Sequence, residues 1–562
     1  MNKIFILAFI LVLSSCNKKS DSKTSIFDLT LFSKNSIQID SLTIINYKDS
    51  TLVDFYRSNK FNTAWDLQSN RKYFLTEIAS AENEGLKPED YNYKKLIAFE
   101  KSREKLSDSI ITKYDILLTQ SAQLYINHIS KGKLNPKELY SNWDLEEKKV
   151  PVNFILSDAL NNQKLKPALE KCKPKHLIYK KLKASLKILK QFPEDNSTEL
   201  IDSKELIVPN VNNKYVPLIK KRLLYWGDLT KKDTHLTTLY DKKTQEAIKF
   251  FQERHGLKPD AIIEKRTINA LNISKGQRIN QVIVNLERWK WFVNDFGNNY
   301  LLVNIPDYTI VAVKNNDTLQ SQNVVVGRKS RKTPVLESKI SNINLNPNWT
   351  VPPTILREDI YPKAMHDRGV FRRKGLHIFD WENNEIDPYT WKREDANKYK
   401  YVQKPSRNNA LGLMKINFPN RFSVYLHDTN HRNFFGLSFR SLSSGCVRLE
   451  KPLEMAAYIL NDTINWPLKK IKDTTDIENY RKLLKIKQQK IDSNNAKLLA
   501  NNPTLIIENK PLPNSELKTI VIKIKEDIQL HQLYWTAWES KGILNFREDI
   551  YSLDANLFEK LR

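Results

Sequence analysis

The chain has 562 residues, and its 91 Lys or Arg against 64 Asp or Glu give a formal net charge of +27. With 40% hydrophobic and 28% charged residues it is not a wholly disordered chain, and its 13 glycines exclude a collagen-like one. The length predicts several domains. The basic charge fits either a general abundance of lysine or attraction to an anionic surface. Because no paired Cys/His finger, RNP-type strand or heptad-bearing basic helix accompanies it, we expect no nucleic-acid partner.

The first segment has the pattern of an export signal. Its apolar run, residues 4–13, is shorter than the roughly 20 residues that span a bilayer. The ending Leu13-Ser14-Ser15-Cys16 resembles a bacterial lipobox, in which the cysteine becomes the lipidated first residue. We therefore predict a signal peptide over 1–15 and a lipid-anchored tether over 16–44. The alternative is an ordinary signal peptide with an incidental Cys16.

Residues 45–204 have a mostly helical pattern. Apolar residues recur at steps of three and four before Gly132, which indicates one buried helix face. The residues on that face are Tyr114, Leu118, Ala122, Tyr125 and Ile129. No cluster of catalytic residue types accompanies them, so this region is predicted to be a helical scaffold. Cys172 has no partner motif and is interpreted as a small buried hydrophobe.

Residues 205–275 form a compact helical unit. Helices are expected from Val216, around Ala247–Phe251 and over Thr267–Leu271, with Gly256 as a helix C-cap. The phrase EAIKFFQERHGLKPD resembles the three-helix peptidoglycan-binding module of cell-wall enzymes. It departs from that module at Ala261, where the family often has glycine. Some copies serve only as spacers, so the resemblance leaves glycan binding open.

The remaining chain, residues 276–562, has mostly strand patterns. Strands are predicted at residues 301–305, 310–313, 323–327 and 520–524, and around Leu533–Trp538, from β-branched runs separated by turns. The charged, irregular stretch 355–404 has the pattern of a capping insertion between strands. The Lys/Asn-rich stretch 472–513 is predicted to be a helical insertion.

Two segments carry the candidate chemistry. In Arg421–Asp428 (RFSVYLHD), period-two alternation puts Tyr425 and His427 on the face opposite Phe422, Val424 and Leu426. Ser443-Ser444-Gly445-Cys446 is a small-residue turn that suits a nucleophile, with His427 as its base. Backbone N–H groups of Gly445 and Cys446 are expected to converge on an oxyanion. His427 and His431 lack a third ligand, so no metal site is expected.

These residues resemble the catalytic motif of the L,D-transpeptidase family, with its YkuD-type domain. NLERWKW, NPNWTVPP, NALGLMKINFPN and YLHDT fit the large Gram-negative subgroup, in which Ser444 replaces an inner histidine. The resemblance implies a multidomain α+β fold: a helical scaffold, a peptidoglycan-binding module and a mostly-β catalytic domain with a capping insertion. It also implies a periplasmic location in a Gram-negative envelope, with the inner or outer membrane as partner of the lipid anchor.

The resemblance implies a reaction without cofactor or metal. Cys446 would attack the third residue of a peptidoglycan tetrapeptide stem, release D-Ala as a thioester forms, and pass the acyl group to an acceptor amine in a 3→3 cross-link. Tyr425, Trp349 and Arg448 are the candidates for the substrate groove, and Ser443 and Ser444 for shaping the turn. Hydrolysis by an L,D-carboxypeptidase and attachment of a protein remain alternatives, as does a non-enzymatic wall-binding lipoprotein with an inert cysteine. The sequence leaves the acceptor and the oligomeric state open.

Overall fold

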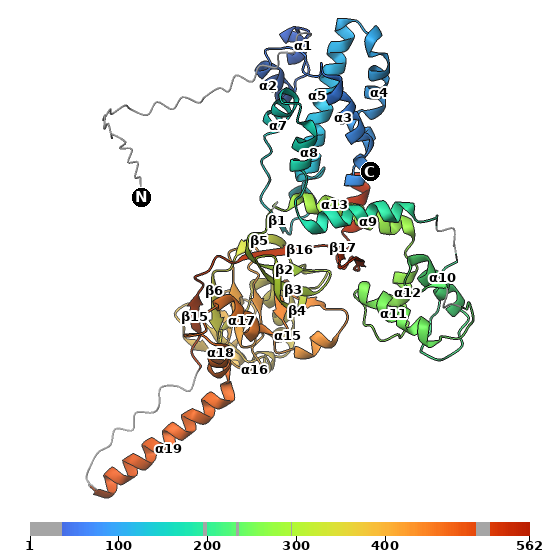
Figure 1. The fold of residues 1–562 in the computed structure, drawn as a ribbon. Coiled ribbons are helices and arrows are strands. Elements are labelled where there is room, and N and C mark those ends of the chain that lie inside the picture. The colour runs from blue at the N-terminus through green and yellow to red at the C-terminus, as the bar shows by residue number, and fades with distance from the viewer. Residues whose placement is uncertain (1–35, 195–198, 232–234, 294, 502–516) are drawn as a thin grey trace, which may run out of the picture.

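A computed structural model describes residues 36–194, 199–231, 235–293, 295–501 and 517–562 (Figure 1). The predicted lipidation residue Cys16 and residues 502–513 of the second insertion lie outside these ranges. A helical region stands above a large β-sheet, and a smaller group of helices lies beside the sheet. The multidomain α+β class predicted from the sequence is confirmed by this arrangement.

The first helical region has its own core. In α5 all five residues of the predicted face are buried, and Gly132 follows the last turn. Cys172 ends α8 inside the same core. The α-helices here are α1 (Ser41–Ile45), α2 (Ser50–Ser58), α3 (Gln68–Ala79), α4 (Tyr93–Ser102), α5 (Asp108–Lys131), α6 (Pro136–Leu139), α7 (Val152–Asn161) and α8 (Leu165–Cys172). The 3-10 helices are η1 (Ala81–Glu84), η2 (Pro88–Tyr91) and η3 (Arg103–Lys105).

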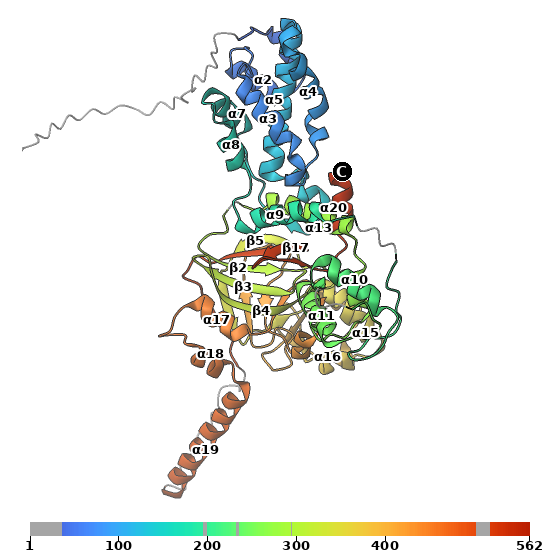
Figure 2. The same cartoon turned by 45° about the vertical axis from the view of Figure 1, so that its right-hand side comes forward.

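Two helices form a layer between this region and the sheet, as Figure 2 shows. They are α9 (Leu177–Gln191) and α13 (Lys275–Trp291). Both helices bury their apolar residues in the core of the sheet, where Trp289 stacks on Trp535 with ring centroids 4.1 Å apart. Although α9 falls within residues 45–204, it therefore packs with the catalytic half of the chain. The last helix that the structure describes, α20 (Asp554–Leu561), packs against α13.

A third core belongs to the small group of helices α10 (Val216–Trp226), α11 (Lys242–Arg254) and α12 (Lys265–Leu271). Gly256 follows the cap of α11 with a φ of +66°, as the C-cap prediction requires. Ala261 has a φ of +62°, which explains why glycine suits this position better. Arg547 crosses from the sheet side to this unit. Its Nη1 donates to the Arg254 carbonyl at 3.0 Å, and a Cβ on Gly256 would overlap its side chain.

The large sheet runs in the order β1-β5-β16-β2-β3-β4-β14-β12-β11-β6-β15, with β13 paired to β4. Its strands are β1 (Trp143–Asp144), β2 (Asn299–Asn304), β3 (Thr309–Lys314), β4 (Asp317–Gly327), β5 (Val335–Lys339), β6 (Asn342–Leu345), β11 (Met414–Asn417), β12 (Leu426–His427), β13 (Ser441–Ser443), β14 (Val447–Leu449), β15 (Ile520–Lys523) and β16 (Gln529–Leu533). A hairpin, β17 (Ala537–Ser540) and β18 (Ile543–Phe546), follows. The strands predicted at 301–305, 310–313, 323–327 and 520–524 are present. Around Leu533–Trp538 the prediction is wrong in part, because β16 ends at Leu533 and β17 begins at Ala537, and side chains accept the N–H groups of Trp535 and Thr536. The strands β12, β13 and β14 bring the candidate catalytic residues together.

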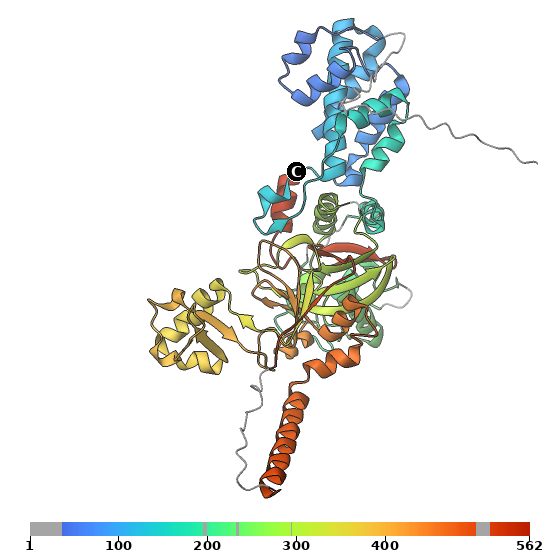
Figure 3. The ribbon, with the colours of Figure 1, turned by 90° about the vertical axis from the view of Figure 1, so that its left-hand side faces the viewer.

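The capping insertion folds as a separate lobe around its own apolar core (Figure 3). A four-stranded sheet joins it to the catalytic domain through β7. The strands are β7 (Trp349–Thr350), β8 (Leu376–Phe379), β9 (Glu385–Ile386) and β10 (Lys400–Gln403). The helices are α14 (Pro353–Ile355), the π-helix η5 (Leu356–Ile360), α15 (Tyr361–His366), α16 (Gly369–Arg373), η6 (Pro388–Thr390) and η7 (Ala396–Lys398).

The second insertion begins with a long helix, α19 (Ile477–Asn501), that projects from the catalytic domain (Figure 1). The helices before it, α17 (Pro452–Leu460) and α18 (Leu468–Thr475), pack onto the sheet and bury Ile471. A short 3-10 helix, η8 (Arg432–Gly436), precedes β13. In the part of the chain that the structure describes, no helix is long and apolar enough to cross a membrane.

Candidate active site

Cys446 lies in the turn between β13 and β14, beside β4 at the middle of the sheet. Gly445 before it has a φ of +116°, a backbone conformation that favours glycine. Ser443 closes the turn, because its hydroxyl donates to the Cys446 carbonyl at 2.5 Å and accepts from the Gly445 N–H at 3.1 Å. The turn is therefore held by its own hydrogen bonds, as a shaping role for Ser443 requires.

A second set of bonds reaches the turn from the last part of the chain. Thr333 Oγ1 donates to the Gly445 carbonyl at 2.8 Å, and the Thr333 N–H donates to the Tyr551 hydroxyl at 3.0 Å. That hydroxyl in turn donates to the Gly327 carbonyl at 2.7 Å. Tyr551 thus helps to fix the position of the turn that carries Cys446, acting through Thr333.

The pairing of β12 with β14 sets which side chains share a face. The two strands are parallel, with Leu426 opposite Val447 and His427 opposite Arg448. Leu426 and Val447 are buried in the core, so their neighbours along each strand point to the other face. The residues brought together on that face are Tyr425, His427, Cys446 and Arg448.

The predicted alternation is only partly right for residues 421–428. Ser423 has a φ of +54°, and strand pairing begins only at Leu426. The cause is the side chain of Asn420, whose Oδ1 accepts the N–H groups of Phe422 and Val424 at 3.1 Å each. A side-chain acceptor of this kind competes with the ladder of a sheet. Phe422 is consequently half-buried rather than part of a regular strand face.

The Cys446 thiol is only partly accessible. Burial raises the pKa of the thiol, while a backbone hydrogen bond and the hydroxyl of Tyr425 favour the thiolate. The charges of Lys415 and Arg448 act in the same direction as Tyr425. The Tyr425 hydroxyl also meets the side chain of Trp349 at the base of the cap. Two predicted groove residues, Tyr425 and Trp349, therefore lie at the nucleophile.

His427 is buried, with 5% of its surface exposed, and is not in an open groove. Burial, Arg448 and Lys415 lower the pKa of its imidazole to about 3, from an ordinary value of about 6.5. Its Nδ1 is shut off from solvent and has no hydrogen-bond partner among the described residues. The resting imidazole is therefore neutral and has one ring nitrogen without a fixed partner.

Lys415 is the residue that sequence reasoning missed. It pairs with His427 across β11 and β12, and its Nζ lies 3.9 Å from the centre of the Tyr425 ring. Within the described residues no carboxylate forms an ion pair with it. The signal was present in the sequence, because Met414 and Ile416 on either side are core residues and period two turns Lys415 to the catalytic face.

Arg448 is the second cation of the site. Its guanidinium lies 5.8 Å from the centre of the Phe434 ring, and burial lowers its pKa. Its Nε and Nη1 are shut off from solvent without hydrogen-bond partners among the described residues. Three side chains thus lie in one row across three adjacent strands: Lys415, His427 and Arg448. The imidazole has one unpaired cation on each side.

The expected oxyanion donors need one correction. The Gly445 N–H is bonded to Ser443 Oγ inside the turn, so it does not point at a substrate oxygen in this structure. The Cys446 N–H has no acceptor within the described parts of the chain. This N–H is available to bind a developing oxyanion. The Tyr425 hydroxyl lies close to the Cys446 sulfur.

Arg331 ties the cap to the catalytic turn. Its guanidinium pairs with Glu358 at 2.5 Å and with Asp359 at 2.6 Å, both in η5 of the cap. The Arg331 Nη1 that pairs with Asp359 also donates to Ser444 Oγ at 3.0 Å. Ser444 therefore serves the turn through Arg331, a residue that the sequence analysis does not single out. No group of three or more His, Cys, Asp or Glu suited to a metal lies within the described residues.

Comparison with known proteins gives matches in three regions of the chain. Family models match the chain as "Scaffold domain" over residues 50–186, "Putative peptidoglycan binding domain" over 212–271 and "L,D-transpeptidase catalytic domain" over 298–472. The last range contains His427, Cys446 and the capping insertion. These three matches confirm the predicted combination of regions.

One similar protein is the "Putative L,D-transpeptidase" of Haemophilus influenzae (strain ATCC 51907 / DSM 11121 / KW20 / Rd), 36% identical over 206 residues. That match covers 35% of this chain, and the chain spans 42% of that protein. The solved L,D-transpeptidase of Xylanimonas cellulosilytica DSM 15894 is 14% identical over 48% of this chain and 96% of its own, with a TM-score of 0.17. That of Stackebrandtia nassauensis is 15% identical over 47% and 91%, with a TM-score of 0.20.

Proposed function

Since the chain carries an L,D-transpeptidase catalytic domain together with a scaffold and a peptidoglycan-binding domain, we propose that it forms 3→3 cross-links in peptidoglycan. The observation that carries the proposal is the face shared by Cys446, Tyr425, His427 and two unpaired cations. A thiol held on a fixed turn beside an imidazole is the arrangement of a cysteine acyltransferase.

Substrate binding would begin with the cations. The donor tetrapeptide ends in a D-Ala carboxylate one residue beyond the bond to be cleaved. Lys415 and Arg448 are free to receive a carboxylate, and pairing there satisfies guanidinium N–H groups that are otherwise shut off without partners. Burial is the main cause of the lowered pKa of His427, and the charges of Arg448 and Lys415 add to it. One carboxylate bound between these cations offsets part of their positive charge, so the pKa of His427 should rise when substrate binds.

The first chemical step makes a thioester. Cys446 Sγ bonds to the carbonyl carbon of the third stem residue while its proton passes to His427. The carbonyl electrons move onto oxygen, where the Cys446 N–H and the Tyr425 hydroxyl stabilise the charge. When the oxyanion collapses, the C–N bond to D-Ala breaks, and the departing amine takes the proton from His427.

The second step transfers the acyl group. The side-chain amine of an acceptor diamino acid attacks the thioester carbonyl, gives one proton to His427 and expels Cys446 as the thiolate, which regains that proton. Water in place of the amine would make the chain an L,D-carboxypeptidase, and a protein amine would attach that protein to the wall. The partners of the reaction are therefore the donor and acceptor stem peptides.

Location forms part of the proposal. The lipobox-like ending at Cys16 supports a lipid anchor on the periplasmic side of a Gram-negative envelope, and this rests on the sequence alone. Replacing Cys16 with serine should release the protein from membranes, as measured by partitioning into detergent. Equal partitioning of both proteins would overturn the anchor.

The decisive experiment incubates the purified protein with disaccharide-tetrapeptide and identifies the products by mass spectrometry. A dimer that has lost one D-Ala is expected, together with an acyl-enzyme in which Cys446 is modified. Cys446→Ala should abolish both products, while Cys172→Ala, in the scaffold core, is the matched control and should change neither. Release of D-Ala with no dimer at any acceptor concentration would replace cross-linking with carboxypeptidase activity.

A further inference from the structure

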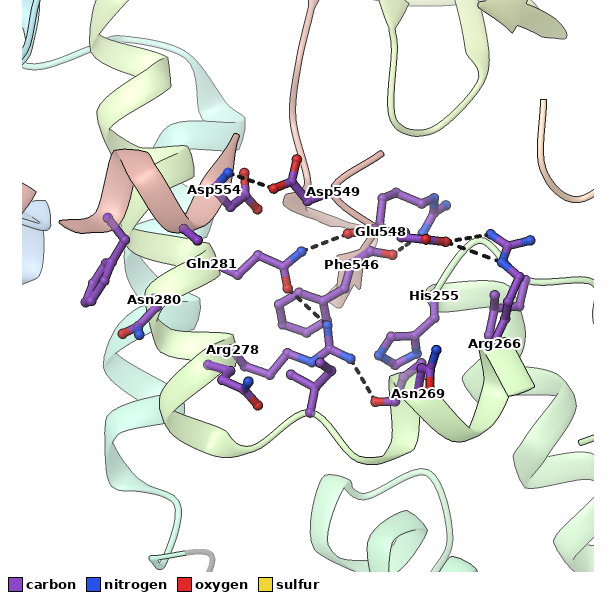
Figure 4. Close-up of a pocket in the computed structure, with 17 residues that line it drawn as sticks. His255, Arg266, Asn269, Arg278, Asn280, Gln281, Phe546, Glu548, Asp549 and Asp554 are labelled. Atoms are coloured by element: carbon purple, nitrogen blue, oxygen red, sulfur yellow. Dashed lines mark hydrogen bonds and ion pairs between the residues drawn. The ribbon is translucent and has the colours of Figure 1, made fainter. Parts of the chain in front are cut away.

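A cavity of about 500 Å³ lies where the peptidoglycan-binding unit meets the catalytic domain (Figure 4). One wall comes from α12 and the end of α11, one from the start of α13, and one from the segment between β18 and α20. The volume is within the range of small-ligand sites, and domain interfaces are common places for them. None of the groups in the proposed reaction lines this cavity.

Arg278 stands at the centre of the cavity in Figure 4. Its side chain is buried, stacks on Phe546 with Cζ 4.3 Å from the ring centre, and donates to Gln281 Oε1 at 3.0 Å and to the Ala270 carbonyl at 3.1 Å. Across the described residues no carboxylate lies within ion-pair distance of it. A buried guanidinium that is held in place but lacks a counter-charge is prepared to bind an anion.

The other acidic and basic groups of the cavity already have partners. Arg266 pairs with Glu548 at 3.1 Å, and Asp549 accepts the Tyr534 hydroxyl at 2.6 Å. Asp554 pairs with Arg288 at 2.6 Å. The lining residue Arg547 pairs with Asp307 at 2.6 Å. Asp549 keeps its negative charge, because its partners are a hydroxyl and the Asp554 N–H. Arg278 is therefore the lining arginine that has no carboxylate partner among the described residues, which favours a ligand with a carboxylate.

The remaining lining suits a sugar or peptide. Phe546 and Phe558 give apolar surface, and the amides of Asn269 and Asn280 have no hydrogen-bond partners among the residues that the structure describes. An amide offers both a donor and an acceptor, so two free amides can bind hydroxyl or acetamido groups. The cavity combines these with a cation, which a purely apolar pocket would lack.

The cavity is also connected to the catalytic turn. Asp549 in its wall accepts from Tyr534, whose hydroxyl accepts the Tyr551 N–H at 2.9 Å. Tyr551 in turn holds Thr333, the residue bonded to Gly445. A ligand in the cavity would therefore contact a wall that is joined to the turn of Cys446 by a continuous series of hydrogen bonds.

We propose that this cavity binds an N-acetylmuramyl peptide through its carboxylate, and so holds one peptidoglycan strand while the catalytic turn acts on stem peptides. This inference rests on the proposed function, and it adds a binding site that needs residues of both domains. The carboxylate would pair with Arg278, the amides would take the acetamido and hydroxyl groups, and the phenyl rings would cover the apolar part of the ligand.

Calorimetry on the full chain carrying Cys446→Ala tests the proposal without turnover. The probe is N-acetylmuramyl-L-alanyl-D-isoglutamine, which lacks the third stem residue and so is not a donor, and the comparison is the same compound with its carboxylate converted to an amide. The acid should bind about tenfold or more tightly than the amide, the usual effect of one charge-assisted hydrogen bond.

Two variants and a control complete the design. Arg278→Gln should remove the preference for the acid, and Ala270→Trp should block the cavity and abolish binding. Lys249→Gln is the matched control, because it removes one cation from the exposed face of α11 outside the cavity, and it should bind as the parent does.

Absence of binding at millimolar probe would overturn the proposal, as would unchanged binding in folded Arg278→Gln and Ala270→Trp proteins. Either result leaves the product assay with disaccharide-tetrapeptide unaffected, so failure of this site is distinguishable from failure of the proposed function.

Discussion

The pair formed by Cys446 and His427 should be neutral in the free enzyme, and this can be tested through the pH dependence of the thiol. The pKa of His427 is about 3, whereas that of Cys446 is raised above its ordinary value of about 8.5. With a pKa of about 3, His427 carries a proton in only about one molecule in 10⁴ at pH 7, and the raised pKa of Cys446 keeps its thiol protonated.

The thiolate–imidazolium form is thus a minor species of the free enzyme. The rate of alkylation of Cys446 by iodoacetamide should therefore rise about tenfold per pH unit from pH 5 to pH 8, since only the thiolate reacts. The assay follows the mass of the adduct over time in a Cys16→Ser, Cys172→Ala background, so that Cys446 is the thiol observed.

Three variants separate the causes. His427→Gln should leave the alkylation profile of the free enzyme nearly unchanged, yet slow acylation by tetrapeptide by about 10²–10⁴-fold, because the base is needed once substrate has bound. Lys415→Met removes a cation near the sulfur, so the pKa of Cys446 should rise and alkylation at pH 7.5 should slow. Arg448→Met should raise the pKa of Cys446 in the same way, because it removes the other nearby charge.

A plateau in the wild-type rate between pH 5 and pH 7.5 that disappears in His427→Gln would refute this reasoning. It would show that the imidazole is already protonated beside a thiolate at rest, and that the two flanking cations do not control its charge.

The remaining predictions concern backbone and docking. Gly256→Ala should destabilise the chain by more than Gly227→Ala in thermal unfolding, because both carry a left-handed φ costing about 1–2 kcal/mol but only the first Cβ displaces the docked guanidinium; equal losses would contradict this. Ala261→Gly should raise stability by up to about 1 kcal/mol, since the position is left-handed, and a fall in the melting temperature would count against it. Arg331→Met should loosen the cap and increase its cleavage by trypsin at least several-fold, whereas Arg357→Met, at an exposed arginine, should not. An unchanged cleavage rate in Arg331→Met would show that Arg331 does not hold the cap in place.

Much of the fold was predictable because it depends on local periodicity. The face of α5 follows from steps of three and four, and the strands from β-branched runs bounded by turns. Because a thiol needs a base to attack at neutral pH, His427 could be predicted as the partner of Cys446, and the resemblance to a catalytic motif indicates the same pair. The pairing of β12 with β14 supplies the geometry that makes the motif a site.

The rest depended on contacts between distant segments. The bend at Ser423 follows from hydrogen bonds to the Asn420 side chain, which a pattern of apolar residues does not contain. Lys415 lies on the catalytic face only because β11 pairs with β12. The engagement of the Gly445 N–H by Ser443 depends on the exact shape of the turn, so a small-residue motif predicts a tight turn without identifying its free donors.

The contact of Arg331 with the cap has a consequence for the sensitivity of the protein to its ionic surroundings. In this structure two carboxylates of the cap pair with that cation; if the cap moved away, the mouth of the site would lose two negative charges and expose one positive charge. Partly exposed ion pairs weaken as salt rises. Added salt should therefore favour the open form, and an acidic stem peptide should meet a more attractive entrance there than in the closed one.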